Sequence, residues 1–456
     1  MGLDEALHAI ATEYSRERSF ERLQRSLPQE WIEQALRATG TATIRRRRLP
    51  AEQVIWLVLG MALYRDLPID LIVTELQIAL PAESGEVARS AIPAARVRVG
   101  PDPFQYLFSR SAEVWAHSSA ALDRWRGLAL YGLDATTLRV PDSDENRATF
   151  GNTKTWRGNG ESGYPMVRLA ALMALRSHLL AAARFDGCSV ASEIALAKAL
   201  WSEIPDRSLV LIDRGFFSAD IFHEITSKKD QRHWMTRARK DNKWTVVKKL
   251  GASDSLVEMT VSGEARRKNP DLPRTMQVRA IKYRHRGYPA GVILTSLLDS
   301  KKYAAREIVG LYHERWETEL GYDEIKTHLL LREESIRSKS PELVRQEIWG
   351  ILLTYNLIRL EMERAADAAQ VSPLRISFVN SMRVIQFAWR IAATMHSPGQ
   401  TGNRLRALRD DLRHLILPPR RPERRFPRAV KIKMSNYPRK LRPPLPKRNR
   451  GKVALK

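Results

Sequence analysis

Apolar residues recur at helical spacing through the first 125 residues of the chain. Three stretches, "LPQEWIEQALRAT", "LPAEQVIWLVLGMALYRD" and "LPIDLIVTELQIAL", each place a proline just ahead of such a pattern. Proline favours the first turn of a helix, where its missing N–H is not needed for a hydrogen bond. A further helix is expected over residues 103–118. The pattern predicts a helical N-terminal domain over residues 1–125.

Near Leu128 the pattern changes from helical spacing to short apolar runs. "LALYGLDATTLRV" is rich in β-branched and aromatic residues and predicts a strand, and "SLVLID" predicts a buried one. "MVRLAALMALRS" and "HLLAAARFD" are strand candidates between them, although their alanines and leucines would also permit helix. "ASEIALAKALWSEI" predicts a helix. The order strand, strand, strand, helix, strand is typical of a ribonuclease-H-like α/β core, whose first part we expect over residues 126–229.

The rest of the chain divides into three regions. Residues 230–300 contain alternating runs such as "TMQVRAIKYRHR" and predict a β-rich insertion. A long helix is expected from about Tyr303, with further helices to about Leu415, so residues 301–416 complete the core. Residues 418–456 hold fifteen Lys or Arg, eight prolines and one acidic residue. Such a segment cannot bury enough apolar surface to fold alone, so a basic disordered tail is predicted over residues 417–456.

Positive charge is in large excess. The chain has 76 Lys and Arg against 51 Asp and Glu, which gives a formal net charge of +25. Such an excess indicates a polyanionic partner, nucleic acid first and an anionic membrane surface second. A ribosome-associated or merely basic surface is the alternative. The helical N-terminal domain is therefore predicted to bind DNA.

Several protein classes do not fit the sequence. Cys188 is the only cysteine, which excludes a disulfide or a cysteine zinc site within the chain and fits a reducing cytoplasm. The first twenty residues contain early acids and no apolar run, so no secretory signal is expected. Two apolar runs, 54–64 and 167–185, are too short or too charged to predict membrane spans. We expect a cytoplasmic protein.

Three carboxylates are the candidates for chemistry. Asp134 in "YGLDATTL" and Asp213 in "VLIDRGF" each follow an apolar run, and strand ends are where sites assemble in α/β sheets. Glu319 lies on a predicted helix that could pack beside those strands. Hard divalent cations prefer oxygen ligands, and a pair of them can promote in-line displacement at phosphorus. The three residues predict a site for two Mg²⁺ or Mn²⁺ ions that acts on a phosphodiester.

The helix that carries Glu319 has other polar residues at the same spacing. In "LYHERWETELGYDEIK", Tyr312, Arg315, Glu319 and Lys326 fall within about 60° of helical arc at about 100° per residue. Arg315 has a fork suited to phosphate oxygens, Lys326 offers a point charge and Tyr312 a hydroxyl donor. These three are the predicted DNA-binding residues. The alternatives are a surface ion pair between Arg315 and Glu319 and a core-edge position for Tyr312.

The spacing Tyr-x2-Arg-x3-Glu-x6-Lys resembles the signature of the insertion-sequence-four family of DDE transposases. "DATTLRVPDSDENRATFG" and "LIDRGFFSADIF" look like the surroundings of the family's first and second catalytic aspartates. The resemblance covers roughly residues 25–440. It implies a ribonuclease-H-like core, dependence on divalent metal, and cut-and-paste DNA transposition in the bacterial cytoplasm, at the nucleoid. It also implies that Asp134, Asp213 and Glu319 are the catalytic metal ligands.

The expected function is a transposase that binds the terminal inverted repeats of its insertion sequence. Water attacks a phosphodiester and frees a 3′-hydroxyl, which attacks the opposing strand to give a hairpin and later attacks target DNA. Double-stranded DNA and a second copy of the chain are the expected partners. The alternatives are a non-catalytic DNA-binding repressor and a nuclease that cuts without joining. Trp234 and Trp244 are expected to pack in the core, with stacking on an extruded base as the alternative.

Overall fold

The structure is a computed structural model in which residues 27–42, 49–75, 89–151, 163–227, 231–284, 290–331, 336–394 and 411–418 are described. The arginine run at 45–48 and most of the Gly-rich stretch after Phe150 lie outside these residues. The predicted tail also lies outside them, apart from its first two residues. The predictions made for these segments stay predictions.

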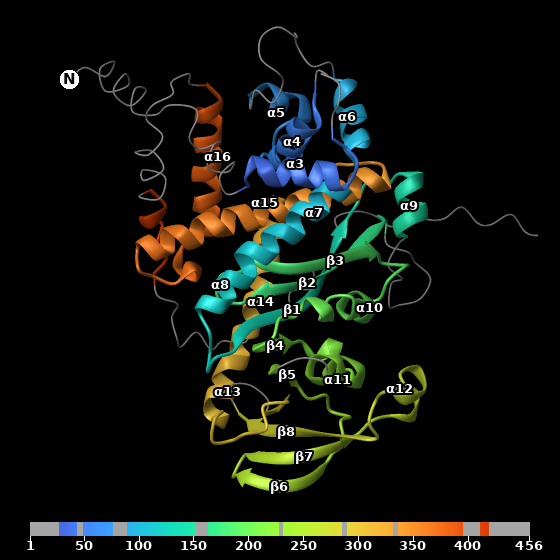
Figure 1. The fold of residues 1–456 in the computed structure, drawn as a ribbon, viewed down its shortest axis with the longest axis vertical. Helices are drawn as coiled ribbons and strands as arrows, with labels where there is room; N and C mark the ends of the chain where they lie inside the picture. Colours follow the sequence, from blue (N-terminus) through green and yellow to red (C-terminus); the bar gives the residue numbers. More distant parts are fainter. Residues whose placement is uncertain are drawn as a thin grey trace, which may run out of the picture.

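The described strands form one mixed sheet of nine strands in the order β3-β2-β1-β4-β5-β9-β8-β7-β6. The strands are β1 (Ala129–Arg139), β2 (Met166–Ala174), β3 (Leu180–Gly187), β4 (Ser208–Ile212), β5 (Arg232–Arg237), β6 (Thr245–Gly251), β7 (Asp254–Thr260), β8 (Thr275–Tyr283) and β9 (Gly291–Thr295). Strands β1, β4 and β5 are parallel to one another, and every other pairing is antiparallel. Figure 1 shows the sheet along the molecule, with β6–β8 at the lower end.

The first five strands fit the predicted ribonuclease-H-like core. Both segments that could have been helix, β2 and β3, are strands, because they pair with each other and β2 pairs with β1 over nine positions. Most of their residues are buried, which suits alanine and leucine in a sheet covered on both faces. The helix expected after them is shorter than predicted: α10 (Glu193–Lys198) ends before a 3-10 turn, Trp201–Glu203.

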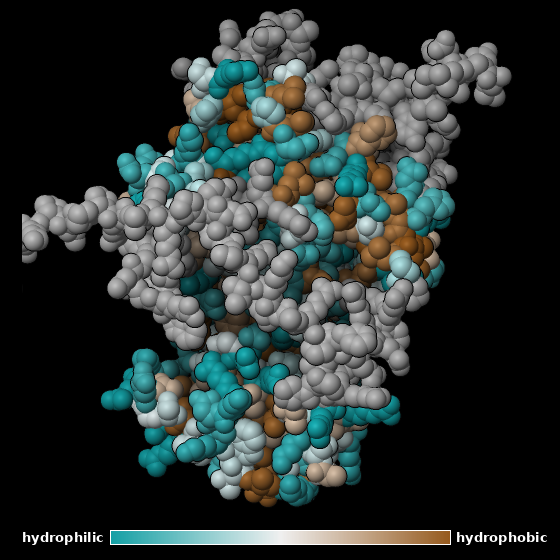
Figure 2. Space-filling view, turned by 180° about the vertical axis from the view of Figure 1, so that it is seen from behind, coloured by the Kyte–Doolittle hydropathy of each residue, from teal (hydrophilic) through white to brown (hydrophobic). Residues whose placement is uncertain are grey.

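The region expected to be a β-rich insertion continues the sheet of the core. Its first strand, β5, pairs in parallel with β4, so β5 belongs to the core. Strands β6–β8 extend the sheet beyond β9, which pairs with β5. The helix α12 (Gly263–Lys268) has no buried residue, and β6 is almost fully exposed. Figure 2 shows that this lower end of the molecule is mainly hydrophilic.

All described elements before β1 are helical, as the sequence predicts. They are α3 (Gln29–Ala38), α4 (Ala51–Leu63), α5 (Ile69–Glu75), α6 (Ala91–Val99), α7 (Asp102–Ser111), a π-helical turn (Ala112–Ala116) and α8 (His117–Leu122). Several of them pack on α15 (Pro341–Ala368), and their apolar residues share one core with the sheet (Figure 1). Gly350 of α15 faces the side chain of Val58 so closely that a Cβ would clash. The domain boundary and the DNA-binding role stay predictions.

The other described α-helices are α9 (Asp144–Phe150), α11 (Ala219–Ser227), α13 (Ala305–Tyr312), α14 (Trp316–Asp323) and α16 (Phe378–Thr394). In the part of the chain that the structure describes, no helix is both long and apolar enough to cross a bilayer.

The expectation of one regular helix from about Tyr303 is wrong. Helix α13 passes through a 3-10 turn (His313–Arg315) into α14, which continues as a π-helix (Glu324–Leu329). A 3-10 turn rotates more per residue than an α-helix and a π-helix rotates less, so the calculated arc does not describe this segment. Tertiary contacts decide its shape, because α14 lies directly against the sheet. A Cβ on Gly132 of β1 would clash with Thr318, and a Cβ on Gly321 with Met173.

We expect Gly132→Ala to destabilise the protein by about 1–3 kcal/mol, the usual cost of overpacking. The added methyl group would clash with Thr318 Cγ2 and lie 2.7 Å from Leu175 Cδ2, so α14 would have to move away from β1. Gly310→Ala is the matched control, because Gly310 lies exposed on α13 with no atom within 4 Å of the added carbon. It should stabilise by up to about 1 kcal/mol. Chemical denaturation measures both, and equal effects would contradict the close seating of α14.

Candidate active site

The pairing of β1 with β4 brings the two predicted aspartates together. The strands are parallel, and their register pairs Leu133 with Ile212. Asp134 and Asp213 are the residues that directly follow this last pair, and neighbouring strands usually lie about 4.8 Å apart. Asp213 follows the end of β4, as predicted. The prediction that Asp134 ends its strand is wrong, because the residues after it continue the ladder with β2 as far as Arg139.

Both aspartates are held by nearby hydrogen bonds. Asp213 Oδ2 accepts from the backbone N–H of Gly215 at 2.9 Å and caps a short 3-10 turn. Asp134 Oδ1 accepts from the N–H of Ala135 at 2.8 Å, and its Oδ2 accepts from the hydroxyl of Thr318 at 3.4 Å. The Tyr322 hydroxyl donates to the backbone carbonyl of Asp134 at 2.7 Å. Two hydrogen bonds from α14 to Asp134 therefore fasten the helix to β1.

Glu319 reaches the same site through Arg315. Arg315 Nη2 donates to Glu319 Oε1 at 2.8 Å, and Arg315 Nη1 lies 3.8 Å from Asp213 Oδ1. The arginine side chain is 11% exposed, whereas the carboxylate side chains are 39% and 38% exposed. The ion pair considered as an alternative is present. It is largely buried on the arginine side and extends to Asp213, so it is more than a solvated pair on a helix surface.

Burial dominates the electrostatics of Asp134. Burial raises the pKa of its carboxyl to about 6, and the charges of Asp213 and Glu319 add to the rise. The N–H of Ala135 and the guanidinium of Arg315 oppose it. The pKa of Arg315 is raised, because its bond to Glu319 and the nearby Asp213 outweigh the effect of burial. Three carboxylates thus share one positive charge.

The donor set suits a hard divalent cation. Asp134 on β1, Asp213 after β4 and Glu319 on α14 all interact with Arg315, and carboxylate oxygens are the ligands that Mg²⁺ and Mn²⁺ prefer. Among the described residues, no three acidic, His or Cys side chains lie close enough together to form a ready-made metal site. Arg315 lies between two of the three carboxylates, so coordination by all three requires its guanidinium to move.

The other two motif residues differ in their surroundings. Lys326 Nζ lies 3.3 Å from the hydroxyl of Thr136, which is two residues beyond Asp134 on β1. Tyr312 is buried in an apolar cluster, and burial raises its pKa to about 12. Its hydroxyl has the backbone of Arg237 as a partner. Lys326 therefore contacts β1 two residues beyond Asp134, whereas Tyr312 occupies a core edge, and the DNA contacts of both stay predictions.

Sequence reasoning missed three residues around the site. Thr318 and Tyr322, at i and i+4 on α14, hold Asp134 from the helix side, and their spacing was a visible signal. Trp316 is 56% exposed, and the guanidinium carbon of Arg315 lies 5.6 Å from the centre of its ring. Trp234 is buried and stacked on Phe222 with ring centres 3.8 Å apart, which confirms core packing.

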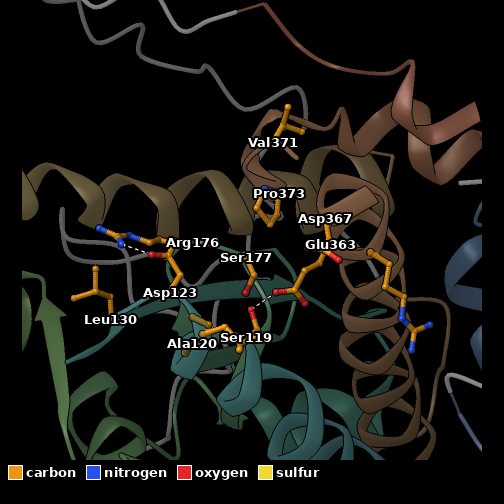
Figure 3. A pocket seen from close by; sticks show the side chains of 13 residues that line it. Ser119, Ala120, Asp123, Leu130, Arg176, Ser177, Glu363, Asp367, Val371 and Pro373 are labelled. Carbon is orange, nitrogen blue, oxygen red and sulfur yellow. Dashed lines mark hydrogen bonds and ion pairs between the residues drawn. The ribbon is translucent and has the colours of Figure 1, made fainter. Parts of the chain in front are cut away.

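A pocket of about 400 Å³ lies elsewhere, between α8, the β2–β3 turn and the end of α15 (Figure 3). In it the hydroxyl of Ser119 donates to Glu363, and Arg176 donates to Asp123 at 2.6 Å. None of Asp134, Asp213 and Glu319 lines it. The pocket is therefore separate from the carboxylate site.

Comparison with known proteins gives consistent matches. The family model "Insertion element 4 transposase N-terminal" matches residues 17–109, and "Transposase DDE domain" matches residues 128–357. The transposase InsG of insertion sequence element IS4 from Escherichia coli K12 is 38% identical over 415 residues, which is 90% of this chain and 92% of InsG. The putative transposase InsZ of the same organism is 34% identical over 56% of this chain and 88% of InsZ. A piggyBac transposase synaptic complex with hairpin DNA aligns over 89% of this chain and 86% of that chain, at 11% identity and a TM-score of 0.43.

The raised pKa of Asp134 predicts a pH-dependent gain in stability for Asp134→Asn without metal. An unfolded aspartate has a pKa of about 4, so the folded protein binds the extra proton between pH 4 and 6. The stability associated with that proton is fully present below about pH 4 and is lost as pH rises through about 6. At pH 8 the substitution should therefore raise the free energy of unfolding by about 1–3 kcal/mol, and near pH 4 by little.

Chemical denaturation with a metal chelator at several pH values measures this difference. Asp144→Asn is the control, because Asp144 lies exposed in the first turn of α9 and should give a change of a few tenths of a kcal/mol at most. A loss of stability at pH 8 in Asp134→Asn would show that its neighbours stabilise the carboxylate, contrary to the geometry.

Proposed function

The chain belongs to the insertion-sequence-four family of DDE transposases, and on that premise we propose that Asp134, Asp213 and Glu319 are its three catalytic carboxylates. The observation that carries the proposal is the β1–β4 register, which sets the two aspartates side by side on neighbouring strands. Glu319 joins them from α14 through Arg315. These residues come from three separate segments, and no local role in folding requires them to meet.

Catalysis by DDE transposases depends on divalent metal. We assign two ions, Mg²⁺ or Mn²⁺, to the three carboxylates; when bound, they supply positive charge at the attacking and leaving oxygens. The protein contributes the fixed positions of its ligands. Asp134 is oriented by Ala135 and Thr318, and Asp213 by Gly215, so each presents its carboxylate without a search among rotamers. Asp134 must give up its proton before it can act as a ligand, which its pKa of about 6 allows at neutral pH.

The substrate is double-stranded DNA, first at the ends of the element and then at the target. Lys326 lies on the side of β1 next to Asp134, where its ammonium group can hold the phosphate next to the scissile one. In the first step a water oxygen bonds to phosphorus, the bond from phosphorus to the 3′-oxygen breaks, and that oxygen leaves as a hydroxyl. In the joining step the oxygen of this hydroxyl bonds to the phosphorus of another phosphodiester, the bond from that phosphorus to its own 3′-oxygen breaks, and the departing oxygen takes up a proton as the attacking hydroxyl loses one. Two ends must be cut and joined together, which favours a homodimer.

Replacing any one of the three carboxylates should abolish cleavage and leave binding to the element ends intact. Asp134→Asn, Asp213→Asn and Glu319→Gln remove the charge needed to hold metal, whereas DNA binding rests on a chain with a net charge of +25. We expect losses of more than about a thousandfold in rate, as for residues that act as a unit. Linear DNA with an element end, incubated with Mg²⁺ or Mn²⁺, measures cleavage, and a gel shift measures binding.

Asp144→Asn is the matched control and should cut at the rate of the unaltered protein. Cleavage at that rate by Glu319→Gln would remove Glu319 from the site. Strand-transfer products from the unaltered protein separate a transposase from a nuclease that only cuts.

Residues 419–456 should contribute affinity that does not depend on DNA sequence. They hold all fifteen Lys and Arg of the predicted tail. Truncation after Pro418 keeps the bridge between Ile376 and Ile416 and the bond from Arg375 to the Leu417 carbonyl. The logarithm of affinity falls with the logarithm of salt by about 0.9 per phosphate neutralised, so truncation should flatten that slope.

Fluorescence anisotropy on specific and unrelated duplexes over a salt series gives the slopes. A full-length variant with the tail sequence shuffled is the control, and its slope should stay at the original value because its charge is unchanged. An unchanged slope after truncation would show that the tail does not contact phosphate.

A further inference from the structure

Arg315 takes the place of a cation in the carboxylate site. One of its terminal nitrogens donates to Glu319 Oε1 at 2.8 Å, and the other lies 3.8 Å from Asp213 Oδ1. Its charge also acts on Asp134, the third carboxylate. A single guanidinium thus interacts with all three acidic residues, which come from two strands and a helix.

We propose that Arg315 is the resident counter-ion of the metal-free site, and that a divalent cation displaces it from Asp213 and Glu319 and so frees it to bind a DNA phosphate. This inference rests on the proposed function, because it takes the three carboxylates as the metal ligands. It adds a second state for Arg315 and a dependence of its DNA contact on metal.

The competition follows from which oxygens are engaged. Asp213 uses Oδ2 to accept from Gly215, whereas Asp134 uses Oδ1 to accept from Ala135 and Oδ2 to accept from Thr318 at 3.4 Å. On Asp213 the other oxygen, Oδ1, is the one near Arg315, and on Glu319 the arginine holds Oε1. A cation bound by these oxygens and the Arg315 guanidinium cannot occupy the same space, and like charges at contact distance repel strongly where water is scarce.

The arginine already lies beside an exposed aromatic ring. Its guanidinium carbon lies 5.6 Å from the centre of the Trp316 ring, and that ring is 56% exposed. Arginine stacks readily on aromatic faces, and its fork matches the oxygens of a phosphate. Movement farther along the Trp316 ring, away from Asp213 and Glu319, would carry the charge to the surface where a DNA strand can reach it.

Coupling between metal and DNA is the measurable consequence. If metal frees Arg315 for phosphate, metal binding strengthens DNA binding, and by reciprocity DNA strengthens metal binding by the same factor. Without Arg315 both effects change: metal no longer competes with a bound cation, and DNA no longer gains the freed guanidinium.

The first experiment measures Mn²⁺ affinity of the full-length protein without DNA, by the electron paramagnetic resonance signal of free Mn²⁺. Arg315→Ala and Arg315→Gln should bind Mn²⁺ about five- to a hundredfold more tightly than the unaltered protein, the usual range for coupled sites. Arg315→Lys keeps the charge and should stay close to the unaltered protein. Arg214→Ala is the electrostatic control, because Arg214 is exposed, follows Asp213 and carries the same charge. It should change the affinity less than twofold.

The second experiment repeats the titration with an uncut duplex that carries an element end. DNA should tighten Mn²⁺ binding by the unaltered protein and have little effect on that by Arg315→Ala. Thermal melting in chelator, then with Mn²⁺, shows that each variant is folded, and Mn²⁺ should raise the melting temperature most in Arg315→Ala.

The outcomes separate the two proposals. If Asp134→Asn binds Mn²⁺ as the unaltered protein does, the carboxylate site itself is wrong. If Asp134→Asn loses Mn²⁺ but neither Arg315→Ala nor Arg315→Gln gains affinity, the site stands and the displacement of Arg315 is overturned. An equal gain in Arg214→Ala would also overturn it, because net charge alone would then explain the effect.

Discussion

The sharing of one guanidinium, that of Arg315, among three carboxylates is the interaction on which the arrangement of the site depends. The β1–β4 register fixes Asp134 beside Asp213, and α14 adds Glu319. Burial and, to a smaller extent, the two neighbouring charges raise the pKa of Asp134 to about 6. The folded structure thus disfavours the charged form of this carboxyl. Arg315 is the cation that balances these charges in the structure.

The surrounding structure holds Glu319 in place through α14 and the π-helix that continues it. Although burial disfavours its charge, Arg359 and His178 lower the pKa of Glu324 to about 2. Arg359 belongs to α15 and His178 to the β2–β3 turn, so this buried network ties the helix of Glu319 to both. Helix α15 in turn holds the N-terminal helices, for example through Glu347 and Arg65 at 2.6 Å. Removing one partner of such a pair costs several kcal/mol, so the network fixes the position of Glu319 firmly.

Much of this could be predicted from the sequence, because strand pattern and local spacing carry it. The apolar runs before Asp134 and Asp213 predicted a strand before each aspartate, and the parallel pairing of β1 with β4 in the structure brings the two aspartates together. The irregular course of the helix after Tyr312 could not be predicted, because packing on the sheet overrides the regular helical period there. The contact of Arg315 with Asp213 spans 102 positions of the chain and depends on that irregular course. The spacing in the sequence indicated only the other partner of Arg315, which is Glu319, four residues further along the chain.

The net charge of the carboxylate site affects how a DNA phosphate can approach it. In a chain with net charge +25, the metal-free site is a locally negative region, because three carboxylates face one guanidinium. A phosphodiester is repelled from such a region even while basic residues elsewhere hold the duplex. Divalent cations reverse the local sign, and an arginine released from the carboxylates adds to the reversal. On the proposed displacement of Arg315, a scissile phosphate enters only a site that is loaded with metal. Under that proposal, electrostatics separates the binding of DNA from its cleavage.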